Sequence, residues 1–165
     1  MTQQLLSIGR VNTDKEELKL QKSSLIMVPL IIGPVAFVWG VIYIYFEHYI
    51  PASILLSYAT VSVLNLCHLS RTKNIALLQK TQMLLVLVLP FFLMWSLGGF
   101  ALGSFVFIWA FYAPIASVIY EEGTKSIYWF SAFLGLVSLS VFLDPMLMLN
   151  YSSHMPKEAV ALFYF

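Results

Sequence analysis

The sequence has 165 residues, of which 60% are hydrophobic and only 10% are charged, and its formal net charge is +1. Soluble domains are about 25% charged, and a fold of this size has too little interior to bury such an apolar excess. The composition therefore predicts an integral membrane protein. It excludes a nucleic-acid-binding protein, which needs a clustered basic surface, and the single cysteine, Cys67, excludes an internal disulfide.

Long uncharged runs divide the chain. The first 22 residues are expected to form a cytosolic segment with a short helix from about Asp14, because Thr13 and Glu16 have the spacing of a capping box. Since about 20 apolar residues cross a bilayer, residues 23–165 are expected to be one membrane domain. The predicted fold class is all-α, a polytopic bundle of five complete transmembrane helices and the start of a sixth. The expected spans are residues 23–46, 51–69, 78–97, 101–120 and 126–143, with the partial sixth from 157.

The third and fourth spans are expected to form a hairpin. Residues 81–120 contain no charge over 40 positions, about twice the length of one crossing. Gly98 and Gly99 lie near the middle of this run, and a tight reversal needs residues without a Cβ atom. We therefore predict that these two glycines form the turn. The dipeptide Asp144-Pro145 is expected to end the fifth span.

No catalytic motif is present in the sequence. It contains no Gly-rich phosphate loop, no His-Glu-x-x-His and no nucleophile elbow. The interiors of the five expected spans also contain no charged residue, although ion and proton pathways usually need one at membrane depth. We accordingly expect no catalytic residue, no cofactor and no metal in a catalytic role.

Four ionisable residues are predicted on the outer side: Glu47, His48, Asp144 and His154. If the first, fifth and sixth spans pack together, these side chains converge into a site that senses protons or binds a metal ion. The alternative is that they are four hydrated loop residues.

Small residues recur four positions apart on several expected spans. Such pairs let helices approach closely in lipid, so we expect packing faces and a homodimer formed through membrane helices. The pairs are Ala36/Gly40, Ser53/Ser57, Ala113/Ser117 and Ser131/Gly135.

The basic residues predict the orientation of the chain. Four of the nine Lys and Arg residues precede the first span, three lie between the second and third spans or at the start of the third, and one lies between the fourth and fifth. Only Lys157 follows the fifth span. Because basic residues collect on the cytoplasmic side, the N-terminus is expected in the cytoplasm.

Four segments carry a resemblance to a known family: residues 39–43 (WGVIY), 71–74 (RTKN), 89–100 (LPFFLMWSLGGF) and 109–114 (WAFYAP). They resemble the N-terminal membrane domain of bacterial class III adenylate/guanylate cyclases, a region also found on some sensor histidine kinases. The similarity covers roughly residues 14–165, and Leu-Gly-Gly-Phe at 97–100 is its most specific part.

The resemblance implies a six-helix module in the bacterial inner membrane, followed by a cytosolic coiled coil and a cyclase domain. The sequence ends inside the expected sixth helix, so the cyclase domain and its paired metal-binding aspartates are missing. No catalytic residue carries over, and the chain is expected to be inactive as an enzyme.

Two function classes follow. The first is a membrane anchor or sensor module of a signalling protein, whose partners are the lipid bilayer and a cytosolic output domain outside this sequence. The second is a small permease or carrier for an uncharged or lipophilic solute. The sequence feature that favours a carrier is the cluster of Pro29, Gly33 and Pro34 in the first span, because broken helices line the binding cavities of transporters.

Overall fold

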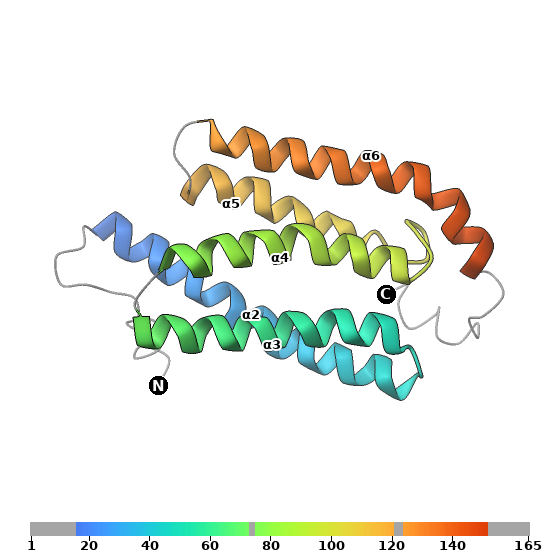
Figure 1. Ribbon diagram of the computed structural model, residues 1–165, viewed down its shortest axis with the longest axis horizontal. Helices are drawn as coiled ribbons and strands as arrows, with labels where there is room; N and C mark the ends of the chain where they lie inside the picture. The colour runs from blue at the N-terminus through green and yellow to red at the C-terminus, as the bar shows by residue number, and fades with distance from the viewer. Residues whose placement is uncertain (1–15, 73–74, 121–123, 152–165) are drawn as a thin grey trace.

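The computed structural model describes residues 16–72, 75–120 and 124–151, and these residues contain helices and turns but no β-strand. The helices, with the labels of Figure 1, are α2 (Glu16–Tyr45), α3 (Tyr49–Thr72), α4 (Ile75–Ser96), the 3₁₀-helix η1 (Val106–Phe111), α5 (Tyr112–Tyr120) and α6 (Lys125–Tyr151). The prediction of an all-α fold is confirmed.

Helix α4 lies at the centre of the bundle (Figure 1). It packs against α3 on one side and against η1, α5 and α6 on the other, while α2 pairs mainly with α3. The helices alternate in direction along the chain, with η1 and α5 together forming one continuous stretch, so the turns gather at two ends (Figure 1). The end that holds the α2–α3 turn and residues 97–105 is called the turn end below, and the opposite end, where α6 begins, the basic end.

Four helices are long and apolar enough to cross a membrane: Ser23–Tyr45, Tyr49–Thr72, Ile75–Ser96 and Lys125–Leu149. They correspond to the expected first, second, third and fifth spans. The expected fourth span differs, because its place is taken by the shorter apolar helix Val106–Tyr120. Ser104 and Phe105 have φ angles of 49° and 53°, and this left-handed backbone cannot continue into a helix. The helix therefore begins at Val106 rather than at residue 101.

One expectation about proline is wrong. Helix α6 does not end at Asp144-Pro145 but continues to Tyr151 with Pro145 inside it. Helix α2 also contains two prolines, Pro29 and Pro34, and continues past both. Prolines inside membrane helices are tolerated because neighbouring groups satisfy the freed backbone carbonyls. The expected start of the first helix near Asp14 and the sixth helix from 157 lie outside the described residues.

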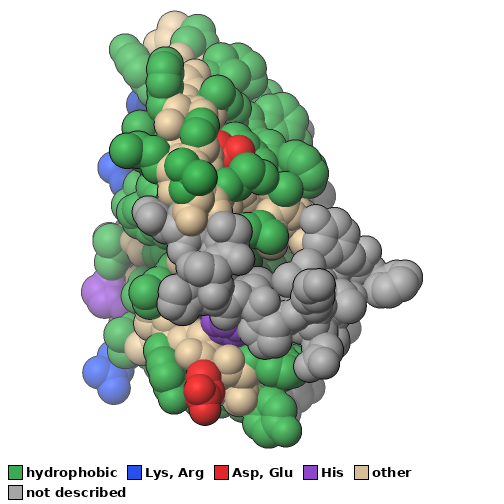
Figure 2. All heavy atoms as spheres, turned by 90° about the vertical axis from the view of Figure 1, so that its right-hand side faces the viewer, with side chains coloured by type: hydrophobic (Ala, Val, Ile, Leu, Met, Phe, Trp, Pro, Cys, Tyr) green, Lys and Arg blue, Asp and Glu red, His purple; other side chains and the backbone are tan. Residues whose placement is uncertain are grey.

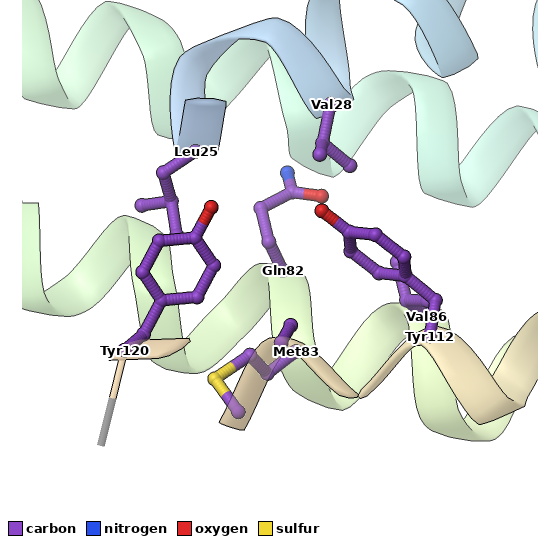
Figure 3. A pocket seen from close by; sticks show the side chains of 8 residues that line it. Leu25, Val28, Gln82, Met83, Val86, Tyr112 and Tyr120 are labelled. Carbon is purple, nitrogen blue, oxygen red and sulfur yellow. The ribbon is translucent and has the colours of Figure 1, made fainter. Parts of the chain in front are cut away.

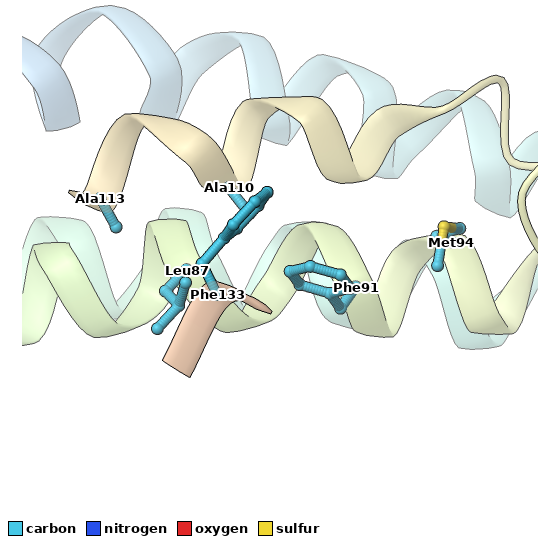
Figure 4. Close-up of a cluster of buried hydrophobic side chains, with 6 residues drawn as sticks. All are labelled: Leu87, Phe91, Met94, Ala110, Ala113 and Phe133. Carbon is cyan, nitrogen blue, oxygen red and sulfur yellow. The ribbon is translucent and has the colours of Figure 1, made fainter. Parts of the chain in front are cut away.

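The largest core cluster surrounds Phe91 of α4, whose side chain is fully buried. Its ring centroid lies 5.8 Å from that of Phe107 in η1 and 5.9 Å from that of Phe133 in α6. Figure 4 shows the buried members of this cluster, which come from α4, η1, α5 and α6. Aromatic rings at these separations attract one another beyond simple contact. Phe91 therefore holds α4 against both η1 and α6.

Only some of the small-residue pairs pack inside the chain. Ala36, Ala113 and Ser117 are buried, and Gly40 lies against α3. The pairs Ser53/Ser57 and Ser131/Gly135 are exposed instead. Close helix approach within the chain therefore uses the first and third pairs.

Candidate functional site

Glu47 and His48 occupy the turn between α2 and α3. Glu47 is exposed and has a left-handed φ of 63°. The backbone N–H of His48 donates a hydrogen bond to the carbonyl of Tyr43 at 2.9 Å, and the two rings make an edge contact with centroids 6.4 Å apart. His48 thus packs against Tyr43, near the end of α2.

Asp144 lies on α6 and serves a different turn. Its Oδ1 accepts a hydrogen bond from the backbone N–H of Phe100 at 2.8 Å, in the turn between α4 and η1. A Cβ atom built on Gly99 would overlap this carboxylate. Gly98 and Gly99 have φ angles of 97° and 104° and follow directly after α4, which ends at Ser96. The structure therefore places both glycines in the reversal, with Asp144 against it.

The predicted outer residues are not gathered into one group. Helix α6 packs on α5 and α4, whereas α2 and α3 lie on the opposite side of α4 (Figure 1). Figure 2 looks onto the turn end, and the acidic side chains visible there stand apart from one another. Within residues 16–72, 75–120 and 124–151, no three metal-ligating side chains meet. His154 lies outside these ranges, so its part in the sensing site stays a prediction.

The structure does gather polar side chains inside the bundle, which the sequence reasoning had missed. Tyr58 and Ser62 are one turn apart on α3 and face Gln82 on α4. The Tyr58 hydroxyl donates to Gln82 Oε1 at 3.2 Å, and Gln82 Nε2 donates to Ser62 Oγ at 3.1 Å. All three residues are at most 5% exposed. These residues are called the Gln82 cluster.

A small cavity adjoins the Gln82 cluster, between α2, α4 and α5. Its volume of about 10 Å³ is room for a single water molecule. Apolar side chains such as Leu25 and Met83 form most of its wall. Figure 3 shows the Tyr112 hydroxyl close to the Gln82 amide, and Tyr120 on the other side of the cavity. The polar groups of the cavity thus come from α4 and α5.

A further polar contact ties α5 to α4. Gln79 Nε2 donates a hydrogen bond to the backbone carbonyl of Tyr120 at 3.2 Å. Tyr120 is the last residue of α5, and carbonyls at a helix end lack partners within the helix. Gln79 and Gln82 thus lie one turn apart on α4 and reach α5 and α3.

The side chains of the Gln82 cluster are neutral hydrogen-bonding groups. The Gln82 cluster consists of an amide and two hydroxyls, and a nucleophile would need an adjacent base. A signal for the cluster was present in the sequence. Gln82 is a strongly polar residue inside a long apolar run, and such residues usually face the bundle interior. No family model, no curated protein and no solved structure matches this chain.

Proposed function

We propose that this chain is the membrane anchor or sensor module of a signalling protein, non-catalytic itself and similar to the membrane part of an adenylate/guanylate cyclase. The observation that best supports this proposal is the geometry of the turn at residues 97–100. Residues 97–100, the most specific part of the resemblance, form a turn whose Gly99 leaves no room for a Cβ beside Asp144. The motif is thereby tied to α6, the described helix nearest the C-terminus.

The proposal includes a topology. The described Lys and Arg side chains, namely those of Arg71, Lys80 and Lys125, lie at the end of α3 and the starts of α4 and α6, all at the basic end in Figure 1. By the positive-inside rule this end faces the cytoplasm of a bacterial inner membrane. Val106–Tyr120 is then the fourth of five crossings in chain order. The expected sixth span from 157, outside the described residues, would return the chain to the cytoplasm.

The partners in this proposal are the lipid bilayer, a second copy of the chain and a cytosolic output domain. Anchoring needs only one helix, whereas four helices here are long and apolar enough to cross a membrane. That surplus favours a module that passes a rearrangement of its helices to the output domain.

The permease alternative has no observation in its favour. Its sequence hint was a helix broken at Pro29, Gly33 and Pro34, but α2 is continuous there. The cavity beside Gln82 has room for about one water molecule.

A reporter fusion tests the proposal. The chain, followed by one added transmembrane helix, is joined to the catalytic domain of a class III cyclase in a cyclase-deficient bacterium, and cyclic AMP is measured. The module should raise the output well above that of the same catalytic domain carried by one unrelated membrane helix. If both fusions give the same cyclic AMP output, the chain acts as an anchor only. Uptake of a neutral solute into liposomes that contain the unfused protein would favour the carrier.

A further inference from the structure

Helix α6 is the least embedded of the long helices. Only 11% of its apolar stretch is buried, compared with 28–33% in the three others. Its first half packs on α5 and on the Phe91 cluster through Phe133, Leu136 and Val137. Its second half carries two hydrogen bonds to the end of α4 and the turn that follows it.

Two hydrogen bonds attach the second half of α6 to the end of α4 and to the turn that follows α4, and they lie one helix turn apart on α6. Trp95 Nε1 donates to Ser140 Oγ at 2.9 Å, and the N–H of Phe100 donates to Asp144 Oδ1 at 2.8 Å. Ser140 and Asp144 are four residues apart and so lie on one face of α6. The bond to the carboxylate is charge-assisted and is the stronger kind.

The backbone of the turn packs against the Asp144 carboxylate, because a Cβ built on Gly99 would overlap its oxygen. The N–H of Phe100 donates its hydrogen bond to the same carboxylate in a part-buried contact. Displacing Asp144 therefore disturbs the turn, and displacing the turn disturbs Asp144.

The residue after Asp144 weakens α6 at the same place. Pro145 has no N–H, so the carbonyl of Val141 loses its partner within the helix, and prolines are the usual site of helix bending. In Figure 1 the last part of α6 bends around the turn end of the bundle. Asp144 thus lies beside the proline of α6, where the helix is hydrogen-bonded to the turn after α4.

We propose that the contact between Asp144 and the turn at 97–105 fixes the direction of the last part of α6, and that α6 bends at Pro145 into a different direction when the contact is lost. The contact couples the conformation of the turn at 97–105 to the direction of the last part of α6. It concerns the mechanics of the chain alone and does not depend on the proposed signalling role.

Distance measurements between spin labels test this in the full chain, reconstituted in lipid nanodiscs after Cys67→Ser. One label pair, Ile108→Cys on η1 and Met146→Cys on α6, reports the terminal part of α6. A second pair, Val118→Cys on α5 and Ile127→Cys on α6, reports its first half. All four positions are more than 60% exposed, so the labels fit without displacing the core.

Asp144→Ala is expected to add a longer-distance population to the Ile108–Met146 pair that the parent lacks, and to leave the Val118–Ile127 pair unchanged. Asp144→Asn keeps an oxygen acceptor and should give a smaller second population. Ser131→Ala, on the exposed side of α6, is the matched control and should give the parent distribution at both pairs.

An Ile108–Met146 distribution identical in the parent and Asp144→Ala would overturn the proposal. A change of equal size at both pairs would also overturn it, because the helix would then have loosened as a whole. If Asp144→Ala does not yield a folded protein, Asp144→Asn decides by the same comparison. Amide hydrogen exchange of the parent gives an independent check: rapid exchange of the Phe100 N–H would contradict a closed contact.

Discussion

Gly40 of α2 lies directly against Leu56 of α3. A Cβ atom built on Gly40 would come within 2.8 Å of Leu56 Cγ and 2.9 Å of its Cδ2, and the carbonyl of Ala52 would follow at 3.5 Å. The glycine therefore sets how closely the two helices approach. In lipid this matters because helix association depends on packing rather than on the exclusion of water.

Gly40→Ala should destabilise the fold by about 1–3 kcal/mol, the usual cost of overpacking. Gly135→Ala is the matched control on α6, since its Cβ would meet no atom within 4 Å. Thermal unfolding in detergent micelles compares the two. Equal melting temperatures for both variants would contradict the close α2–α3 contact.

The Gln82 cluster should show energetic coupling. Tyr58→Phe and Gln82→Leu each remove one partner of the same hydrogen bond, so the double variant should lose less stability than the sum of the single variants. Interhelical hydrogen bonds in membranes contribute about 0.6 kcal/mol on average and up to about 1.7, which sets the expected coupling. Steric-trapping measurements of unfolding give this energy. Tyr128→Phe, at a position 73% exposed, should have no effect alone or with Gln82→Leu.

The turn at 97–105 should depend on Gly99 for two separable reasons. Gly99→Ala suffers from its φ of 104° and from overlap with the Asp144 carboxylate. Removing the carboxylate relieves the second penalty but not the first. Gly99→Ala combined with Asp144→Ala should therefore be less destabilised than the sum of the two single variants. Strict additivity in a thermal unfolding cycle would show that backbone strain alone makes Gly99 necessary.

The proposed orientation predicts which cysteines a membrane-impermeant reagent reaches in intact cells. In a Cys67→Ser background, Glu47→Cys at the turn end should be labelled from outside. Lys125→Cys at the basic end should be labelled only after the cells are opened. The reverse pattern would invert the whole topology.

The sequence predicted most of the fold because apolar runs bounded by charges mark helix positions well. Helix α3 extends the expected span 51–69 by a few residues at each end, and α4 does the same at its start. The expected fourth span began too early because composition does not reveal that Ser104 and Phe105 adopt left-handed backbone. The end of α6 was misplaced because Asp144-Pro145 is a stop signal in isolation. Its carboxylate is instead bound by a backbone N–H 44 residues away in sequence.

The candidate site was harder to predict because it depends on which helices are neighbours. Grouping Glu47 and His48 with Asp144 required the first and fifth spans to pack together, but α4 lies between them (Figure 1). Gln82 was overlooked since its partners, Tyr58 and Ser62, are ordinary residues in a membrane helix. Pairing them needs the register of α3 against α4, which a single sequence does not contain.

The 3₁₀ geometry of η1 has a consequence for the surrounding lipid. A 3₁₀-helix rises about 2.0 Å per residue, so the six residues of η1 cover about 12 Å. The nine residues of α5 add about 13 Å. The combined length of about 25 Å is shorter than a hydrocarbon core of about 30 Å. Hydrophobic mismatch is therefore concentrated along this one side of the protein, where the bilayer is expected to become thinner. Longer acyl chains should strain η1 and α5 before any other helix.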